Sequence, residues 1–123
     1  MDGTTLQEVD MRTAMGLPAV THTHPFGPDH EVFKVAGRVF MMATDAPGEP
    51  IVTVKCEPML AEALRRAFET ITPGYHMNKR HWISIAAGQG ITERLVEDLV
   101  ADAYELVVAG LPKSRRPLGL TRR

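Results

Sequence analysis

Apolar residues recur along this chain with two different spacings, and the spacing predicts where helices and strands lie. Apolar positions three and four residues apart favour a helix after Pro58 and another from Thr92 to about Ala109. In the second of these the apolar positions form a stripe wide enough to cover one face of a sheet. That stripe consists of Leu95, Val96, Leu99, Val100, Ala103, Leu106 and Val107.

A third, shorter helix is expected near the N-terminus from its boundary residues. Thr5-Leu6-Gln7-Glu8 fits a capping box, in which the threonine hydroxyl and the glutamate carboxylate each accept a free backbone N–H group. The helix should continue to about Met15. Gly16 and Pro18 then end it, because glycine tolerates a left-handed cap and proline cannot continue a helix.

Four short runs rich in β-branched and aromatic residues predict strands. They lie at 31–35, 38–43, 51–56 and 82–86, and Ala36-Gly37 joins the first two as a hairpin. Residues 20–28 read as extended chain followed by a turn. Residues 71–81 read as irregular, with Gly74 after Pro73 supplying the positive φ of a type II turn.

This order of elements predicts a two-layer α+β sandwich, with helices on one face of an antiparallel sheet and the order α-β(3,4)-α-β-α. Strands joined by short turns must be antiparallel, because parallel crossovers need a dozen or more residues. The sequence leaves the register open, so the inward residues are expected as pairs of alternatives. These are Val32 or Phe33, Val39 or Met41, Val52 or Val54, and Ile83 or Ile85.

The composition fits one domain at residues 1–112, followed by a basic tail at 113–123. Of 123 residues, 44% are hydrophobic and 24% charged, which argues against a disordered chain. No apolar run is long enough to span a membrane, and residues 1–10 lack the basic start of a signal peptide. The single Cys56 cannot form an internal disulfide. We therefore expect a cytoplasmic protein, as a monomer and without membrane attachment.

Charge is sorted along the chain, although the net charge is only −1. Residues 113–123 contain five basic residues and no acid, whereas residues 93–105 contain five acids and only Arg94 as a base. A protein that coats DNA without specificity would be strongly basic overall. The acidic side of the last helix is expected to face solvent, with protein docking as the alternative.

The segment from Thr72 to Trp82 places aromatic side chains among donors and cations, a combination typical of nucleic-acid sites. The basic residues would contact phosphate, and Asn78 could read a base edge. The alternative is structural: Tyr75 and Trp82 pack into the core while the cations are solvated. The candidate binding residues are Tyr75, His76, Asn78, Lys79, Arg80, His81 and Trp82, with Lys113, Arg115 and Arg116 of the tail.

Metal binding and catalysis find less support. His22 and His24 lie two apart, which on a strand puts both on one face at metal-ligand spacing, and His30 is near in sequence. Asp29 is the one cysteine or carboxylate that could be added to them, and the His22, His24 and His30 cluster is incomplete as a closed site. We therefore expect no tightly bound metal and no cofactor. Cys56 could act as a nucleophile, but lone cysteines are commonly buried and inert. Since the chain also lacks a phosphate loop, a nucleophile elbow and paired carboxylates, we expect no enzyme.

Three segments of this chain together resemble the MmcQ/YjbR family. They are His24-Pro25-Phe26-Gly27-Pro28-Asp29, the run from Ile71 to Trp82 (ITPGYHMNKRHW), and the run from Tyr104 to Lys113 (YELVVAGLPK). The resemblance covers residues 6–113. It implies a CyaY-like (frataxin-like) or secretion-chaperone-like fold, and the family is often labelled DNA-binding. The tail after Pro112 is richer in arginine than the family pattern requires.

Two functional hypotheses remain open, and a third, an enzyme, lacks a sequence signature. The first is a non-enzymatic domain that binds DNA or RNA, which gains if Lys79 and Arg80 share a surface with the tail. The second is a protein-interaction or chaperone-like module, which gains if the sheet exposes an apolar patch. An enzyme gains only if one pocket gathers His24, Cys56 and His76.

Overall fold

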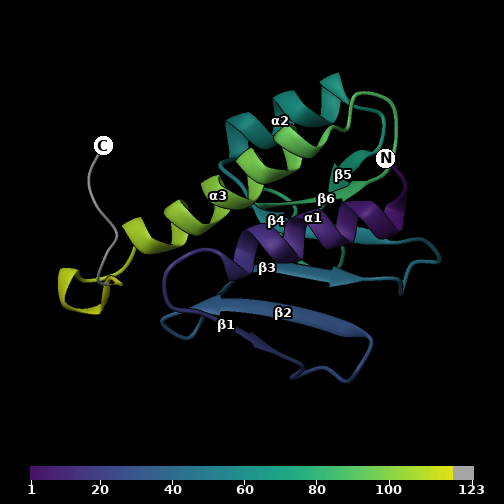
Figure 1. Cartoon of the computed structure of the whole chain (residues 1–123). Coiled ribbons are helices and arrows are strands. Elements are labelled where there is room, and N and C mark those ends of the chain that lie inside the picture. Colours follow the sequence, from purple (N-terminus) through teal and green to yellow (C-terminus); the bar gives the residue numbers. More distant parts are fainter. Residues whose placement is uncertain (118–123) are drawn as a thin grey trace.

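The computed structural model describes residues 1–117, and six antiparallel strands form the one sheet that organises them (Figure 1). The helices are α1 (Gly3–Met15), α2 (Pro58–Ala67) and α3 (Glu93–Ala109), followed by a short 3-10 helix, η1 (Lys113–Arg115). The strands are β1 (Val20–Thr23), β2 (His30–Val35), β3 (Arg38–Thr44), β4 (Ile51–Lys55), β5 (Ile71–Pro73) and β6 (Trp82–Ala86). They are arranged in the order β1-β2-β3-β4-β6-β5.

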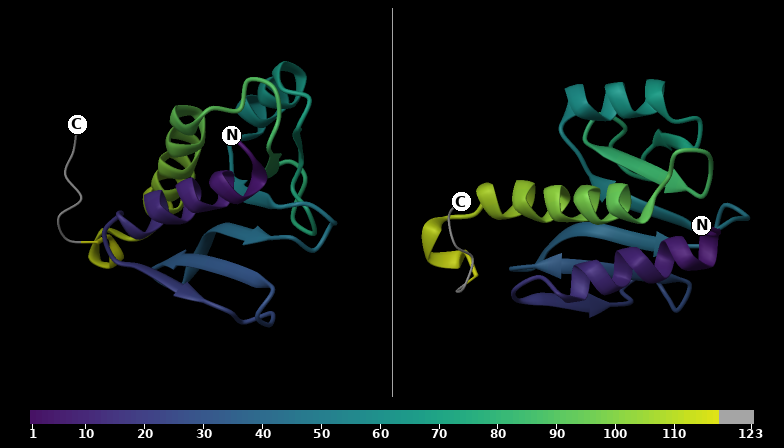
Figure 2. Two further views of the ribbon diagram at one scale, coloured as in Figure 1. Left: turned by 45° about the vertical axis from the view of Figure 1, so that its right-hand side comes forward. Right: turned by 45° about the horizontal axis from the view of Figure 1, so that its top comes forward.

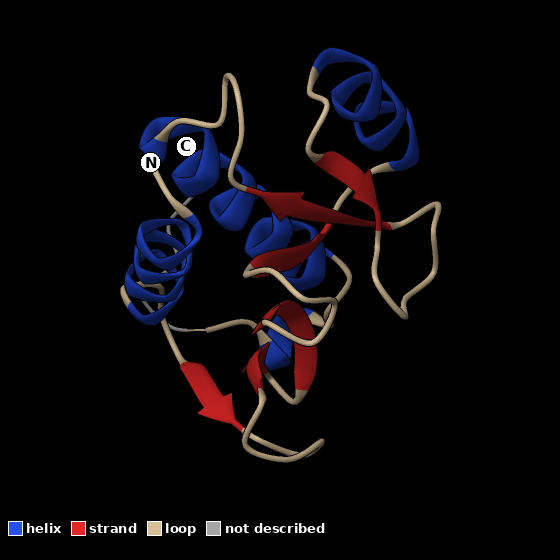
Figure 3. Cartoon of the chain, turned by 90° about the vertical axis from the view of Figure 1, so that its right-hand side faces the viewer, coloured by secondary structure: helices blue, strands red, loops and turns tan. Residues whose placement is uncertain are grey.

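The predicted α+β class and antiparallel sheet are confirmed. Figure 3 shows α1 and α3 along one side of the strands, while α2 lies by the β5 edge. The sequence predicted three or four strands before α2 and one strand after it. The structure has four strands before α2 and two after it. The added strand is β5, in a segment predicted to be irregular. Its Pro73 lacks an N–H group, which a sheet tolerates at an edge, and β5 is an edge strand.

The core lies between the sheet and the helices. One row of paired residues crosses four strands on this face, and each of its members is fully buried: Phe33, Met41, Val54 and Ile83. Val52 and Ile85 form the next row on the same face, so both alternatives expected for β4 and for β6 point inward. The predicted α3 stripe is buried against them at Val96, Leu99, Val100, Ala103 and Val107.

The start of α1 differs from the prediction. The helix begins at Gly3, and the carboxylate of Asp2 accepts the Thr5 N–H at 2.8 Å, so Asp2 and not Thr5 is the N-cap. Both residues have the side-chain oxygen that a cap requires, and the earlier one prevails. Gly16 ends the helix as expected, but with a φ of −81° rather than in the left-handed region. Within residues 1–117, no helix is both long and apolar enough to cross a membrane.

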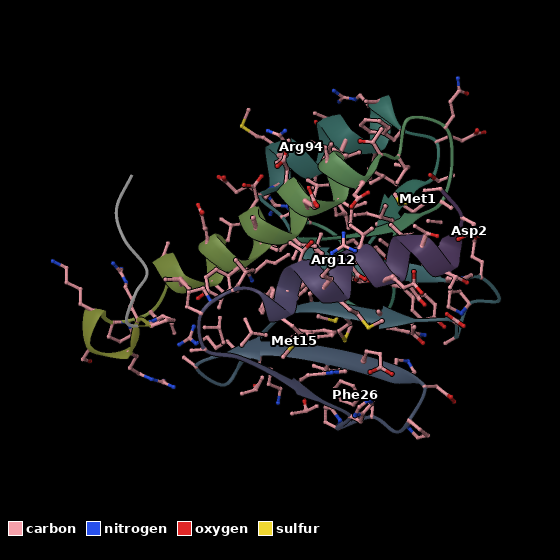
Figure 4. The ribbon with its side chains drawn as sticks, in the orientation of Figure 1. Met1, Asp2, Arg12, Met15, Phe26 and Arg94 are labelled. Atoms are coloured by element: carbon pink, nitrogen blue, oxygen red, sulfur yellow. The ribbon has the colours of Figure 1, made fainter. Side chains whose placement is uncertain are left out.

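The opposite side of the sheet, which we call the far face, is covered only in part, by loops. A second row of paired residues crosses the strands there: Val32, Met42, Thr53, Ser84 and Thr72. Thr53 and Ser84 are buried although no helix covers them. Loop 74–81 bonds directly to Ser84, and Figure 4 shows Phe26 of loop 24–29 beyond β2, on the side away from α1. The two loops therefore flank the far face.

Candidate functional site

A cavity of about 230 Å³ lies on the far face between the two loops. Loop 24–29 and the first residue of β2 contribute Phe26 and His30, and loop 74–81 contributes the residues after Gly74. The outward side chains of β3 and β4 form its floor. We call it the far-face cavity, and its lining residues are Phe26, His30, Met42, Thr44, Thr53, Tyr75, His76 and Met77. Two of the segments that carried the family resemblance thus meet at one place.

Hydrogen bonds to the sheet fix loop 74–81. The Tyr75 N–H donates to Ser84 Oγ at 2.9 Å, and Ser84 Oγ lies 2.7 Å from Thr53 Oγ1. Gly74 is required by close approach, because a Cβ at this position would lie 2.5 Å from the Cβ of Trp82. Its φ is not positive, so the predicted type II turn with Gly74 in the left-handed region is wrong.

The positive φ in this loop belongs to His76, at +56°. A residue with a Cβ pays of order 1–3 kcal/mol for this region, and such positions cluster at binding and active sites. The His76 ring meets the Tyr75 ring edge to face at 4.1 Å between centroids. The strained backbone therefore presents two adjacent rings at the wall of the far-face cavity.

The basic residues of loop 74–81 face solvent. Lys79, Arg80 and His81 are exposed, and across residues 1–117 no acidic side chain forms an ion pair with Lys79 or Arg80. Asn78 is exposed, and its Oδ1 accepts the Arg80 N–H at 2.9 Å, so this oxygen already has a structural task. The loop thus offers two free cations beside an aromatic wall.

Trp82 is buried, as the structural alternative predicted: its side chain is 7% exposed, and it lies at the start of β6. The Lys55 ammonium sits 5.3 Å from the centre of its ring, within reach of a cation–π interaction. This contact places a third cation next to the loop. Sequence reasoning missed Lys55 because it comes from β4, and only the β4–β6 pairing brings it to Trp82.

The tail cations lie elsewhere. Figures 1 and 2 show η1 beyond the C-terminal end of α3, away from β5 and β6. The Arg115 guanidinium donates to the Ala36 carbonyl of the β2–β3 turn at 2.8 Å, and Arg116 donates to the Leu111 and Ala109 carbonyls. Lys113 is exposed in η1. The structure therefore does not gather the tail and loop 74–81 into one surface, and Arg122 and Arg123 lie outside the described residues.

The arrangement around Cys56 does not favour nucleophilic chemistry. Its thiol is buried, and burial, helped by Asp102 and Glu57, raises the pKa of Cys56 to about 11. A thiol of this kind stays protonated at neutral pH and is a poor nucleophile. The far-face cavity includes His76 but neither Cys56 nor His24, so the arrangement that would have favoured an enzyme is not formed there.

His22 and His24 meet a third residue that the sequence did not single out. Their Nε2 atoms lie 2.5 and 2.8 Å from Glu31 Oε1. Burial raises the pKa of Glu31, but the hydrogen bonds and charges of the two histidines outweigh this and lower it below its usual value. Neither Asp29 nor His30 joins this group. A β1–β2 hairpin register would have revealed Glu31, because residue 24 then lies opposite residue 31.

Several bacterial proteins are similar to this chain over most of its length. The uncharacterised protein YbdF of Escherichia coli O157:H7 is 42% identical over 113 residues, which cover 92% of this chain and 93% of YbdF. The uncharacterised protein YjbR of Escherichia coli K12 is 32% identical over 85 residues, covering 69% of this chain and 72% of YjbR. These names assign no activity.

Solved structures share the fold. A Deinococcus radiodurans protein with a DUF419 domain is 26% identical, with a TM-score of 0.77 and 91% of both chains covered. A Pseudomonas syringae protein is 25% identical, with a TM-score of 0.68 over 81% of this chain and 95% of that one. The family model described as YjbR matches residues 15–106. The chain is therefore a member of the YjbR family, as its MmcQ/YjbR-like segments predicted.

Proposed function

We propose that this chain is a non-enzymatic cytoplasmic domain that binds single-stranded nucleic acid at the far face. The observation that carries the proposal is the far-face cavity itself, whose apolar and aromatic lining stands beside the unpaired Lys79 and Arg80. Single-strand binding sites combine a surface on which bases stack with cations that follow the backbone. A base would enter between Tyr75 and Phe26, and its phosphates would lie toward Lys79.

The geometry favours a short single strand over a duplex. Lys79 and Arg80 are neighbours in loop 74–81, and Lys55 lies over Trp82, the residue that follows this loop. The tail lies at a different end of the molecule. Duplex-binding proteins usually neutralise many phosphates along an extended surface. With a net charge of −1 the protein has little long-range attraction for nucleic acid, so affinity must come from the local contacts. We expect modest affinity that is sensitive to salt.

The test is fluorescence anisotropy with labelled 12-mers of single-stranded DNA, single-stranded RNA and duplex DNA across a salt series. Single strands should bind, and Lys79→Glu with Arg80→Glu should weaken them for every sequence. If two phosphates are contacted, the double reversal should make the slope of log affinity against log salt shallower by about 1.4. Tyr75→Ala should cost about 1–3 kcal/mol of binding if it stacks on a base.

The matched control is Arg66→Glu with Arg94→Glu, which changes the net charge equally on α2 and α3. These residues form exposed i,i+4 ion pairs with Glu62 and Asp98, and such pairs contribute little stability. The control should keep the affinity and slope of the wild type. Absence of binding at about 50 mM salt, or an equal effect of both double reversals, would reject the proposal.

A protein-interaction module is the second candidate, and one observation favours it. Phe26 is 65% exposed at the rim of the apolar far-face cavity, where it could hold a peptide side chain. The distinguishing variant is Phe26→Ala, tested beside Lys79→Glu with Arg80→Glu in a screen of peptides on an array. Peptide binding that is lost in Phe26→Ala and unchanged in Lys79→Glu with Arg80→Glu would favour the protein partner.

A further inference from the structure

The edge of the sheet at β1 brings three possible metal ligands to one point. His22 lies on β1, and His24 follows directly after Thr23, the last residue of the strand. His22 pairs with Phe33 of β2, so Glu31, two residues before Phe33, lies diagonal to His22 and next to His24. One ligand atom from each of these three side chains lies within 4.8 Å of the other two.

Both histidines use the same nitrogen toward the carboxylate. The Nε2 atoms of His22 and His24 lie 2.5 and 2.8 Å from Glu31 Oε1. In a tetrahedral site with bonds of about 2.0–2.2 Å, ligand atoms stand roughly 3.3–3.5 Å apart. The carboxylate would therefore withdraw from His22 by roughly an ångström to admit an ion. Its side chain is 30% exposed and has room to make this adjustment.

The site is held in place on one side and open on the other. The His22 ring stacks on the buried Phe33 ring at 4.4 Å between centroids, with an interplanar angle of 16°. The side chains of His22 and His24 are 32% and 45% exposed, so an ion can reach both. Glu31 also lines a cavity of about 410 Å³ with Gln7 and Met11 of α1, which leaves space for water beside the carboxylate.

The geometry points to a divalent transition-metal site formed by His22, His24 and Glu31. Two imidazoles and one carboxylate form a donor set that zinc accepts, with water in the fourth position. The absence of a thiolate disfavours copper(I), and the two imidazoles disfavour calcium and magnesium, which prefer oxygen ligands. From the sequence we predicted no tightly bound metal because the His22, His24 and His30 cluster is incomplete as a closed site, and the third ligand that the fold brings in is Glu31.

This site is independent of the far-face cavity. Glu31 and Ala43 are paired opposite each other, on the side of the sheet that carries the core, whereas the cavity lies beyond Met42 and Thr53. His30 lines the far-face cavity and is not one of the three ligands. Failure of nucleic-acid binding would therefore leave the metal proposal standing, and the reverse also holds.

The experiment is a Zn²⁺ titration of the tag-free, chelator-stripped protein, followed by isothermal calorimetry and by NMR of the imidazole nitrogens. One equivalent should bind, and the Nε2 resonances of His22 and His24 should shift while those of His30, His76 and His81 stay. Glu31→Gln should weaken Zn²⁺ binding by more than about tenfold, and His22→Ala with His24→Ala should abolish it. The matched control, His76→Ala with His81→Ala, should bind like the wild type.

Thermal unfolding gives a second readout, because an ion that binds only the folded chain raises the unfolding temperature in a concentration-dependent way. Zn²⁺ should raise it for the wild type and for the His76/His81 control, and leave it unchanged for the His22/His24 variant. His24→Ala alone should reduce the rise in unfolding temperature that Zn²⁺ causes. Because the His24 side chain is exposed, this variant should fold like the wild type. No binding at one equivalent, or equal binding by the His22/His24 variant, would overturn the proposal.

Discussion

Strands β2, β3, β4 and β6 present different side chains to the two faces of the sheet. Toward α1 and α3 they carry an all-apolar row, Phe33, Met41, Val54 and Ile83. Toward the loops they carry a mixed row, Val32, Met42, Thr53 and Ser84. The helix face is closed by packing, whereas the far face is closed in part by hydrogen bonds from loop 74–81 to the sheet.

This difference separates stability from recognition. Packing energy is spread over many helix-face contacts, so changes there should lower the stability of the whole domain. On the far face a few specific bonds satisfy Thr53, Ser84 and the Tyr75 N–H group, while His30 Nδ1 has no partner among the described residues. Part of the far-face cavity is lined by loop residues, which can vary without opening the core. Loops on a fixed scaffold are common sites of ligand binding.

The largest expected effect is on the helix face. Leu99→Ala should lower the free energy of unfolding by about 2–5 kcal/mol, because the removed side chain leaves a cavity between α3 and the sheet. Leu99 is 5% exposed. Leu60→Ala is the matched control, since Leu60 is 40% exposed on α2 and should cost less than about 1 kcal/mol. Urea denaturation measures both, and equal losses would mean that the comparison of burial is wrong.

Asp10 breaks the apolar pattern of the helix side. It is fully buried in α1, neither carboxylate oxygen has a hydrogen-bond partner among the residues described, and burial raises its pKa well above the ordinary value. The folded chain therefore binds more protons than the unfolded chain above a pH of about 3.9. The stabilisation that comes from protonated Asp10 is therefore fully present below that pH, and it is lost as the pH rises through the pKa of Asp10 in the folded chain.

Asp10→Asn removes the titrating proton and keeps the shape. The variant should match the wild type near the unfolded pKa and exceed its stability at pH 8, by about 1–3 kcal/mol. Chemical denaturation at several pH values measures this difference, with Glu8→Gln on the exposed side of α1 as the control. A constant difference between Asp10→Asn and wild type across the pH range would show that Asp10 does not titrate as argued.

The next effect is expected on the far face. Ser84→Ala removes the partner of the buried Thr53 hydroxyl and the acceptor of the half-buried Tyr75 N–H group. It should cost about 1–3 kcal/mol of stability. Amide exchange at Tyr75 should also accelerate, because this bond holds loop 74–81 on the sheet. Thr21→Val on the exposed edge strand β1 is the control, and similar exchange in both variants would argue against the proposed role of Ser84.

The fold could be predicted further than the site. Helical spacing in 93–109 and β-branched runs in β2, β3, β4 and β6 are local signals, and they gave the right elements. The strand Ile71–Pro73 was not predicted because Pro73 and Gly74 are turn signals. An edge strand tolerates the proline, but which strand lies at the edge depends on the whole sheet. The Asp2 cap was not predicted because three residues with suitable side chains, Asp2, Thr4 and Thr5, lie within four positions.

The site depended on pairings that lie far apart in sequence. Loop 74–81 was singled out by its composition, but that it shares the far-face cavity with Phe26 follows only from the strand order. Glu31 joins His22 through the β1–β2 register, and Lys55 joins Trp82 through the β4–β6 register. A sequence shows which residue types are present, while register decides which of them meet.

The smallest effect is expected in the tail, and it sharpens the contrast between its cations and those of loop 74–81. The Arg115 guanidinium already donates to the Ala36 carbonyl, and η1 lies away from the far-face cavity. Lys113→Glu with Arg115→Glu should therefore change the salt slope of nucleic-acid binding by less than about 0.7, the contribution of one phosphate. Loss of the exposed Arg115 bond should cost at most about 1.5 kcal/mol of stability. The same anisotropy series measures the slope beside Lys79→Glu with Arg80→Glu. An equal change in the two variants would mean that a bound strand runs from the cavity to the β2–β3 turn, and the site would have to be redrawn to include η1.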